Sequence, residues 1–437
     1  METQARPLKP SALDPAVADD LVKARSRGSW PLERTGPHRI AMFSGNFNCV
    51  RDGANRALNR LAAHALGRGH AMRIYSPTVP SPAFAPAGDL VAVPSCAIPF
   101  RSEYRFAPRL PSMLATDIRR FAPSVVHVSA PDALGAAAIR LARAIDVPVI
   151  ASVHTRFETY LDYYRLGLLR PLAEAWLRRF YDRCDAVLAP SRETAEQLRA
   201  NGIKATHIWS RGVDPAQFSP TLRDKAWRRS IDVADHEVVL LFFGRLVAEK
   251  GLATFEATVR ALRGHGLPIR ILIVGDGPER RRLVKRIPDA AFTGHLDGPA
   301  LGRAIASADI LINPSVTELF GNVTLEAMAS GLAVVAADVA ANRALVKDGH
   351  SGVLVPAISA VHYAQAVHAL VREPARRRMI AEAALARAAM FDWTRTLDVV
   401  LHAYATTRRA KRPEGSSMIG KPPADSLSVA CNRFPHE

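Results

Sequence analysis

The chain has 437 residues, of which 48% are hydrophobic and 23% are charged, which is typical of a soluble globular protein of more than one domain. Its 58 lysines and arginines exceed its 41 acidic residues and give a net charge of +17. This excess suits phosphorylated ligands or an anionic membrane surface, and equally an arginine-rich composition without a binding role. Zinc-finger, RRM and helix-turn-helix patterns are absent, so we expect no nucleic acid as partner.

The ends of the chain and its cysteines indicate the compartment. A run of roughly 18 or more uncharged apolar residues, as a membrane-spanning helix needs, does not occur. Residues 1–37 contain no apolar segment of signal-peptide length, and we expect them to form a disordered tail. The four cysteines have no paired spacing and indicate neither a disulfide framework nor a metal site. We therefore expect a cytoplasmic protein.

The first half of the chain alternates strand-like and helix-like segments. Short apolar runs predict buried strands, and apolar residues every three or four positions predict helices. Strands without polar alternation are typical of a parallel sheet covered on both faces. The predicted strands are 38–45, 71–77, 124–131, 147–154 and 184–191, and the predicted helices are 54–70, 132–146 and 192–202.

The same alternation restarts after "IWSRGVDPAQFSP". Strands are predicted at 237–244, 269–277, 290–296, 308–315 and 332–338, with helices between them. We predict an α/β fold of two doubly wound Rossmann-like domains, 38–213 and 214–385, facing a central cleft. Helix 386–408 is expected to cross back to the first domain, and residues 409–437 to form a disordered tail.

Two stretches of the first domain carry candidate site residues. Asp52 and Gly53 stand at the start of a predicted helix, where backbone N–H groups can receive a phosphate. His154 ends the predicted strand "VPVIASVH" and would point into the cleft. The competing interpretations are a plain strand-to-helix loop and a structural histidine.

The second domain places cations and glycines after its strands. Arg245 and Lys250, in "FFGRLVAEKG", suit a diphosphate, and their only acidic sequence neighbour is Glu249. Gly275 and Gly277 start a dinucleotide-like fingerprint whose third glycine is replaced by Arg280, which counts against an NAD-dependent oxidoreductase. We interpret this stretch as a tight turn on the nucleotide side of the cleft.

The stretch "TELFGNVTLEAMASG" contains two carboxylates eight positions apart. Glu318 lies in a predicted loop and Glu326 near the start of a helix, with Asn322 and Val323 offering N–H groups at the helix start. Both carboxylates can face one bound ligand. A carboxylate near a helix start is also an ordinary stabilising feature, so this spacing does not establish chemistry.

Several ordered stretches resemble one known family. "FFGRLVAEKGL", "VGDGPERRRL", "FTGHL", "ADILINPSVTELFGNVTLEAMASGLAVVAAD" and "DGHSGVLVP" are similar to the C-terminal domain of retaining GT-B glycosyltransferases of family four. "DGANRALNRLAAHALGRGH", "VHVSAPDALGAAAIRLAR" and "ASVHTRFETYLDYY" resemble its N-terminal domain. The resemblance extends from about residue 38 to 407 and includes the glutamate–seven residues–glutamate signature.

The resemblance implies roles for the donor-binding residues. Arg245 and Lys250 match the residues that hold the diphosphate of a nucleotide-diphosphate sugar, Glu326 the one that grips the ribose, and Glu318 the one that contacts the transferred sugar. The backbone at Asn322 and Val323 would meet sugar or phosphate oxygens.

Two further matches lie in the first domain. His154 would lie near a far hydroxyl of the sugar, and Gly53 would approach the diphosphate. The sequence holds no D-x-D triplet, so we expect a metal-independent site with no cofactor besides the donor. We take His154 and Glu318 as catalytic candidates and Gly277 among the donor-binding ones.

The resemblance is strongest to lipid-directed enzymes of the mannosyl-, glucuronosyl- and sulfoquinovosyl-diacylglycerol type. It implies transfer of a hexose or hexuronic acid, from GDP-mannose or a UDP-sugar, to a lipid or glycolipid acceptor. Segments 98–110 and 163–183 interleave arginine with aromatic and apolar residues, which fits an anionic membrane surface on the inner face of the cell membrane or, equally, a helix with one face in the core. A soluble sugar, sugar phosphate or polysaccharide acceptor, a sugar phosphorylase, and a non-catalytic nucleotide-sugar binder remain alternatives.

Overall fold

The computed structural model describes residues 36–50, 52–98, 101–154, 168, 170–203 and 207–407, and one compact unit spans His38–Glu437. The tails predicted at 1–37 and 409–437 lie outside the described residues, except for Gly36 and Pro37. So do residues 155–167, which include most of "HTRFETYLDYY" and the start of segment 163–183.

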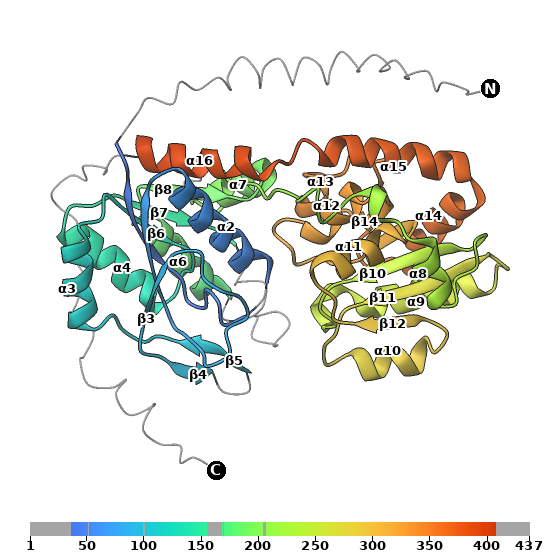
Figure 1. Ribbon diagram of the computed structural model, residues 1–437, viewed down its shortest axis with the longest axis horizontal. Coiled ribbons are helices and arrows are strands. Elements are labelled where there is room, and N and C mark those ends of the chain that lie inside the picture. Colours follow the sequence, from blue (N-terminus) through green and yellow to red (C-terminus); the bar gives the residue numbers. More distant parts are fainter. Residues whose placement is uncertain are drawn as a thin grey trace, which may run out of the picture. The chain divides into compact units, whose positions relative to one another are not determined.

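The first half of this unit is built on a seven-stranded parallel sheet in the order β3-β2-β1-β6-β7-β8-β9 (Figure 1). Residues of β1 alternate between two apolar clusters: Ile40 and Met42 face α2 and α16, whereas Ala41 and Phe43 face α3 and α4. The sheet is therefore covered on both faces, as the unbroken apolar runs predict. Its elements are β1 (Arg39–Phe43), α2 (Gly53–Gly67), β2 (Ala71–Ser76), β3 (Asp89–Ala92), α3 (Ser112–Phe121), β6 (Val125–Val128), α4 (Ala133–Ala144), β7 (Val149–Ser152), α6 (Arg170–Tyr181), β8 (Ala186–Ala189), α7 (Arg192–Ala200) and β9 (His207–Ile208).

The second half has a six-stranded parallel sheet in the order β12-β11-β10-β13-β14-β15. Its β10 alternates in the same way, with Leu240 in the cluster of α9 and α14 and Leu241 in the cluster of α12 and α15. Its elements are η2 (Pro220–Leu222), α8 (Lys225–Ser230), β10 (Val238–Phe243), η3 (Ala248–Lys250), α9 (Leu252–Arg263), β11 (Ile269–Val274), α10 (Arg280–Arg286), β12 (Ala291–Gly294), α11 (Gly298–Ala306), β13 (Ile310–Asn313), α12 (Asn322–Ala329), β14 (Ala333–Ala337), α13 (Ala340–Arg343), β15 (Val353–Val355), α14 (Ala360–Arg372), α15 (Pro374–Ala388) and α16 (Trp393–Thr406).

These two strand orders confirm the prediction of two doubly wound Rossmann-like sheets. In each sheet the strand order reverses beside the first strand, between β1 and β6 and between β10 and β13. Ligands of such sheets bind beyond the carboxyl ends of the strands at these reversals. The sequence pattern did not identify the short strands β3 and β15, nor the antiparallel pair of β4 (Cys96–Ile98) and β5 (Arg101–Phe106), which takes up much of segment 98–110.

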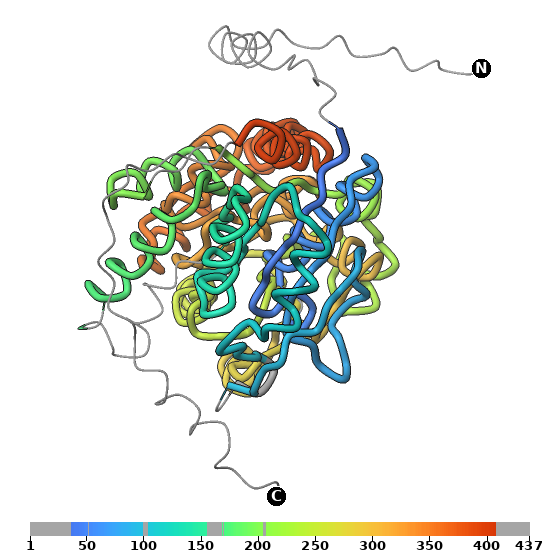
Figure 2. The backbone as a smooth tube through the Cα atoms, turned by 90° about the vertical axis from the view of Figure 1, so that its left-hand side faces the viewer, coloured from blue at the N-terminus to red at the C-terminus, as the bar shows by residue number. Residues whose placement is uncertain are grey.

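Two segments connect the halves and run beside each other. Val213 donates its N–H to the carbonyl of Phe391 and pairs with Asp392. Helix α16, at the red end of the colour scale in Figure 2, then packs on α2 and β9 of the first half. Its Val400 and Tyr404 are buried there. The last described helix therefore completes the core of the first sheet.

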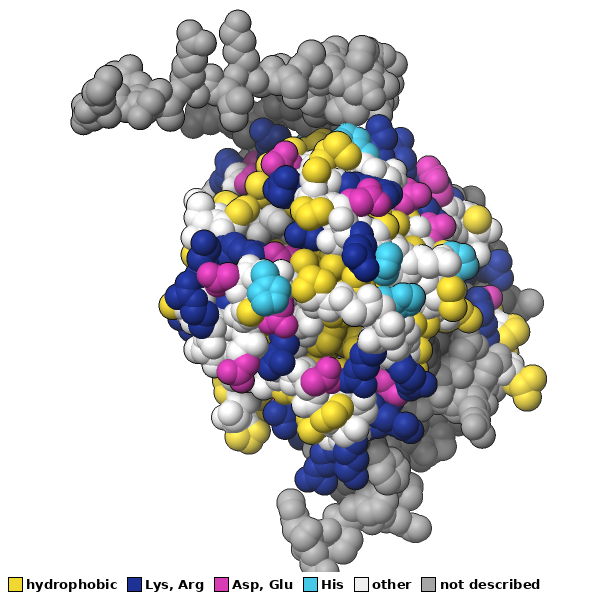
Figure 3. Space-filling view, turned by 90° about the vertical axis from the view of Figure 1, so that its right-hand side faces the viewer, with side chains coloured by type: hydrophobic (Ala, Val, Ile, Leu, Met, Phe, Trp, Pro, Cys, Tyr) yellow, Lys and Arg dark blue, Asp and Glu magenta, His cyan; other side chains and the backbone are white. Residues whose placement is uncertain are grey.

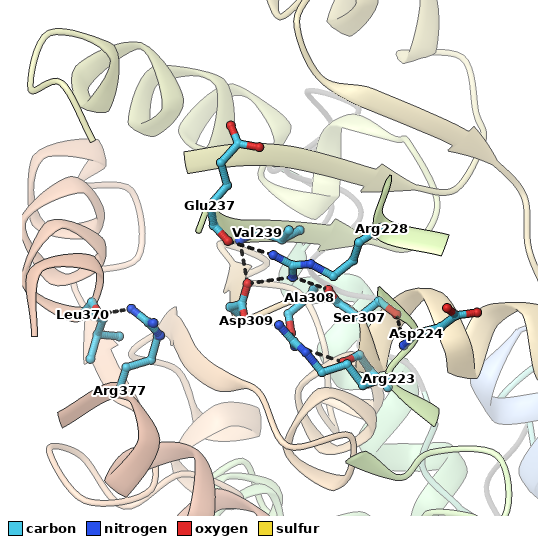
Figure 4. Close-up of polar contacts among 11 residues, drawn as sticks. Arg223, Asp224, Arg228, Glu237, Val239, Ser307, Ala308, Asp309, Leu370 and Arg377 are labelled. Carbon is cyan, nitrogen blue, oxygen red and sulfur yellow. Dashed lines mark hydrogen bonds and ion pairs between the residues drawn. The ribbon is translucent and has the colours of Figure 1, made fainter. Parts of the chain in front are cut away.

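An ion network fastens the start of the second half to its sheet (Figure 4). Asp309, next to β13, accepts hydrogen bonds from Arg223 (2.7 Å), from Arg228 (3.1 Å) and from the Val239 N–H (2.8 Å). Arg228 is buried and also donates to the carbonyls of Ser307 and Glu237. Because the network lies at the amino ends of β10 and β13, it stabilises the end of the sheet opposite the predicted ligand crevice.

None of the helices within the described ranges combines the length and apolar character that crossing a bilayer requires.

We predict that Asp309→Asn lowers the free energy of unfolding by about 3 kcal/mol, because it leaves the buried Arg228 cation without its carboxylate. Urea unfolding followed by circular dichroism measures the change. Asp235→Asn is the matched control: Asp235 pairs with Arg229 at 3.4 Å, both side chains are about 60% exposed, and the loss should stay under about 0.5 kcal/mol. Equal losses in the two variants would contradict a stabilising role for the network.

Candidate functional site

A cleft of about 800 Å³ opens beyond the carboxyl ends of the strands of both halves. Its volume is typical of a small-molecule site. Residues that follow β10, β11 and β13, the first turns of α2 and α12, and Trp393 of α16 line it. Except for Gly277 and His154, the predicted site residues lie on its wall: Gly53, Arg245, Lys250, Glu318, Asn322, Val323 and Glu326.

Two helix N-termini meet across this cleft. Helix α2 begins at Gly53 after the N-cap Asp52, whose carboxylate accepts from the Asn55 N–H at 2.8 Å. A Cβ atom on Gly53 would lie only 2.3 Å from the side-chain nitrogen of Asn322, the first residue of α12. A larger residue here would displace the Asn322 amide, and the positive ends of two helix dipoles together favour an anion between them.

The first turn of α12 differs in detail from the prediction. The Asn322 N–H bonds to the Phe320 carbonyl, so Asn322 presents its side-chain amide to the cleft region rather than a free N–H. The helix start has no side-chain cap hydrogen bond. The N–H groups of Val323 and Thr324 are therefore the backbone donors that the first turn leaves for a ligand or water.

The two predicted cations differ in their surroundings. Lys250 donates to Glu318 at 2.9 Å, and both side chains are mostly buried. The sequence offered only Glu249 as an acidic neighbour, and the fold supplies Glu318 from 68 positions away. Arg245 is 45% exposed and reaches Glu249 only at 3.9 Å, so its guanidinium remains accessible to an anionic ligand.

Among the carboxylates of the cleft, Glu326 has the pKa that departs furthest from its ordinary value. Burial raises its pKa to about 7, and the nearby Glu318 adds to the rise, whereas Arg56 and Arg60 of α2 oppose it. Arg56 and Arg60 follow Asp52 at intervals of four residues, so all three share one face of a helix. This spacing could have identified both arginines as cleft residues from the sequence.

The glycines of the partial fingerprint serve close packing between two loops. A Cβ on Gly277 would lie 2.5 Å from the Leu246 carbonyl oxygen, and the backbone of Gly277 has φ +155°. Gly275 and Asp276 line the cleft, whereas Gly277 does not. Gly277 thus holds the loop after β11 against the loop after β10, which carries Arg245.

His154 follows β7, but both of its ring nitrogens are engaged within the protein. Its Nδ1 accepts from Arg211 at 2.6 Å, and its Nε2 lies 2.7 Å from the Ser152 hydroxyl. Burial, and then the positive charge of Arg211, lower the pKa of His154 well below its ordinary value. The imidazole is therefore neutral and has no free nitrogen for a ligand in this arrangement.

Metal ligands do not gather in the part of the chain that the structure describes: no group of three or more histidine, cysteine, aspartate or glutamate residues there could hold an ion.

Family models match both halves of the chain. The model described as Glycosyltransferase Family 4 matches residues 51–217, and the one described as Glycosyl transferases group 1 matches residues 237–373. The sucrose-phosphate synthase of Thermosynechococcus elongatus has a similar fold, with a TM-score of 0.70 at 19% identity over 84% of this chain and 98% of that one.

Three curated relatives span much of the chain. A GDP-mannose-dependent alpha-mannosyltransferase of Mycolicibacterium smegmatis is 33% identical over 72% of this chain and 84% of its own length. A D-inositol 3-phosphate glycosyltransferase of Stackebrandtia nassauensis is 30% identical over 90% and 97%. An alpha-monoglucosyldiacylglycerol synthase of Streptococcus pneumoniae is 26% identical over 68% and 70%.

We predict that Glu326→Gln stabilises the empty protein in a pH-dependent way. The pKa of Glu326 is about 7 in the folded protein against an ordinary 4.5, so the folded state disfavours the ionised carboxylate. The stability that the protonated Glu326 side chain contributes is therefore lost as pH rises through 7. The variant should gain on the order of 2 kcal/mol over the wild type at pH 8 and almost nothing at pH 5. Urea unfolding at both pH values measures this gain. Glu382→Gln, at an exposed position of α15, should show no such trend, and a pH-independent gain in Glu326→Gln would contradict the raised pKa.

Proposed function

Because the chain belongs to the glycosyltransferases of family 4, we propose that it transfers a mannosyl group from GDP-mannose to a hydroxyl of a lipid or glycolipid acceptor. The observation that carries the proposal is the meeting of two helix N-termini beside Arg245 and Lys250, since these groups suit the diphosphate of such a donor. The mannosyltransferase relative favours GDP-mannose over a UDP-sugar.

The two domains then have different binding roles. Residues 214–385 form the nucleotide-sugar-binding domain, and residues 38–213 form the acceptor-binding domain. Residues 386–408, with α16, return to the acceptor-binding domain and pack on α2. A donor in the cleft would touch both domains, because the first turns of α2 and α12 line it together.

The donor's diphosphate and nucleotide occupy the more positive part of the cleft in this proposal. Arg245 and Lys250 bind the diphosphate, and Gly53 lets the start of α2 approach it. Glu326 accepts hydrogen bonds from the ribose hydroxyls. Gly277 acts indirectly, because it fixes the loop after β11 against the loop that carries Arg245.

The transferred sugar lies on the side of Glu318. Glu318 accepts hydrogen bonds from the sugar while Lys250, 2.9 Å away, balances its charge. Asn322 and Val323 contact oxygens of the sugar or the phosphate. His154 does not line the cleft itself; it acts from behind the wall, where Ser152 and Arg211, the neighbour of the cleft residue Gly212, hold it on the far side of the sugar.

The reaction proceeds with retention at the anomeric carbon and without a metal ion. The bond from this carbon to the diphosphate oxygen breaks, the bond to the acceptor oxygen forms on the same face, and the departing phosphate oxygen takes the acceptor's proton. Arg245, Lys250 and the helix N-termini stabilise the negative charge that develops on the leaving diphosphate. These groups supply the positive charge that a metal ion supplies in other sites.

The acceptor-binding domain offers a route for a lipid. A groove of about 430 Å³ runs between α6 and α7 and reaches Leu319, the neighbour of Glu318. Helix α6 buries Leu177 and Phe180 in the core and exposes Leu172 (70%) and Trp176 (44%) beside the exposed Arg179. One face of α6, the described helix within segment 163–183, thus lies in the core, and we propose that the other contacts an anionic membrane surface.

The surface of the second half differs from that of α6 in how its charged side chains are distributed. On the face of the second half that Figure 3 shows, lysines and arginines are interspersed with acidic and apolar side chains. Helix α6 carries Arg170, Arg178 and Arg179 against one acidic residue, Glu174, and this net positive charge would orient the acceptor-binding domain toward the membrane, with the groove beside it.

A soluble sugar-phosphate acceptor is the second candidate. The D-inositol 3-phosphate glycosyltransferase matches 97% of its own length, which is a longer match than the lipid-directed relative gives. The basic excess of the chain suits a phosphorylated acceptor as well as an anionic membrane.

We predict that the purified protein releases GDP from GDP-mannose when vesicles containing diacylglycerol or a glycolipid are present. The product should keep the anomeric configuration of the donor by NMR, and EDTA should not reduce the rate. Turnover with UDP-sugars alone would overturn the donor assignment, and turnover with inositol phosphate alone would overturn the lipid acceptor.

Glu318→Ala should lower transfer at least about 100-fold without loss of folding, whereas Glu373→Ala, which removes the exposed partner of Arg376, should leave it unchanged.

We predict that the double variant Leu172→Ser with Trp176→Ser loses binding to anionic vesicles, because serine cannot insert into the apolar layer of the interface. Vesicle flotation of the full chain at moderate salt measures the bound fraction. Val361→Ser with Met379→Ser removes two equally exposed apolar side chains from α14 and α15 and should keep full binding. Failure of the wild type to float with these vesicles would overturn the membrane contact.

A further inference from the structure

Five side chains, four from the first half and Tyr404 from α16, form a continuous buried chain of hydrogen bonds. Arg211 contacts His154 at 2.6 Å, His154 contacts Ser152 at 2.7 Å, Ser152 contacts His127 at 2.7 Å, and His127 contacts Tyr404 at 2.6 Å. We call these five residues the His154 chain. Except for His154 itself, which is partly exposed, each is at most 4% exposed.

The chemistry of these groups determines which nitrogen of His154 carries the proton. A guanidinium only donates hydrogen bonds, so His154 Nδ1 must accept from Arg211. The single proton of the neutral ring then lies on Nε2 and is donated to the Ser152 hydroxyl. Burial also lowers the pKa of His127, to about 3, so both imidazoles of the chain are neutral.

Packing restricts the rings as well. Trp209 meets His154 edge-on at a ring distance of 5.3 Å and His127 at 6.1 Å. The guanidinium of Arg211 lies over the same indole at 4.9 Å and donates to the Trp209 carbonyl. Because hydrogen bonds and ring contacts both restrain it, the imidazole of His154 has one defined orientation at the end of β7.

Both ends of the His154 chain belong to the segments that connect the two halves. Arg211 lies two residues before Val213, which pairs with Asp392 of the second connecting segment. A Cβ on the intervening Gly212 would lie 2.6 Å from the backbone nitrogen of Trp393, so the two connections are in tight contact. Tyr404 lies on α16, which the second connection leads into. The orientation of His154 is thus tied to both connections.

We propose that Arg211 and Tyr404 are positioning residues for glycosyl transfer, holding His154 as the neutral Nε2–H tautomer through Ser152 and His127. They touch neither donor nor acceptor and act through the His154 ring. This role rests on the proposed function: the connecting segments place Gly212, Val213 and Trp393 on the cleft wall, and the His154 chain holds these segments from behind through Arg211.

The first experiment needs no substrate. Long-range ¹H–¹⁵N spectra of the full chain with ¹⁵N-labelled histidine report the tautomer of each ring, and His154→Gln assigns the signals of His154. The wild type should show His154 protonated on Nε2 alone and unchanged between pH 5.5 and 8.5. Arg211→Leu should populate the Nδ1–H form, whereas Arg211→Lys, which keeps a donor, should restore the Nε2–H form. A wild-type His154 that is protonated on Nδ1, or that titrates in this range, overturns the proposal even if Arg211→Leu does not fold.

The second experiment separates positioning from general stability. With GDP-mannose as donor, Arg211→Leu should lower kcat about tenfold with little change in donor KM, and Arg211→Lys should recover most of the loss. Tyr404→Phe should shift the His127 signals and lower kcat by a smaller factor. Tyr363→Phe is the matched control, because Tyr363 is fully buried and donates to the Asn313 carbonyl of the other sheet. It should leave the histidine signals and kcat unchanged.

These experiments test the positioning role of Arg211 and Tyr404 separately from the proposed donor. Identical effects of Tyr404→Phe and Tyr363→Phe on the His127 and His154 signals overturn the positioning role of Tyr404. Unaltered His154 signals and kcat in a folded Arg211→Leu overturn that of Arg211. Absence of turnover with GDP-mannose in the wild type counts against the proposed donor, and the tautomer measurement still decides the positioning role.

Discussion

The close approach of two helix N-termini is the constraint on which the cleft depends. Gly53 at the start of α2 and Asn322 at the start of α12 come from different halves of the chain, and a Cβ on the glycine would lie 2.3 Å from the side-chain nitrogen of the asparagine. Two positive helix ends at this distance repel each other when the space between them holds no negative charge. An anionic ligand removes this cost, so the architecture itself favours an anion at this place.

Glu318 and Glu326 both lie near positively charged side chains of the cleft, but they interact with them differently. Glu318 forms an ion pair with Lys250 at 2.9 Å, so its charge is balanced before any ligand arrives. Glu326 faces Arg56 and Arg60 but makes no such short ion pair with them among the described contacts, and burial raises its pKa to about 7. Glu318 is therefore held in an ion pair, whereas the ionisation of Glu326 depends on pH near neutrality.

Contacts at the amino ends of the strands and between the connecting segments stabilise the arrangement of the cleft. Asp309 joins Arg223 and Arg228 to the amino ends of β10 and β13, far along the strands from Arg245 and Lys250. The connecting segments around Val213 and Asp392 bond to each other, and Tyr404 of α16 reaches His127 in the first sheet. Buried polar networks of this kind rigidify a fold because each unsatisfied member would be costly.

The sequence by itself determined the two doubly wound sheets, since uninterrupted apolar runs and helical periodicity are local properties. Most of the site residues that it indicated lie on the cleft wall, because strand ends of a parallel sheet meet at one edge. Only the tertiary structure decided which groups pair there: Lys250 with Glu318 across 68 positions, Glu326 opposite Arg56 and Arg60, and His154 with Arg211 rather than with open space. Periodicity specifies which face of an element is buried but not which neighbour faces it, and hydrogen-bond partners and pKa values follow from that neighbour.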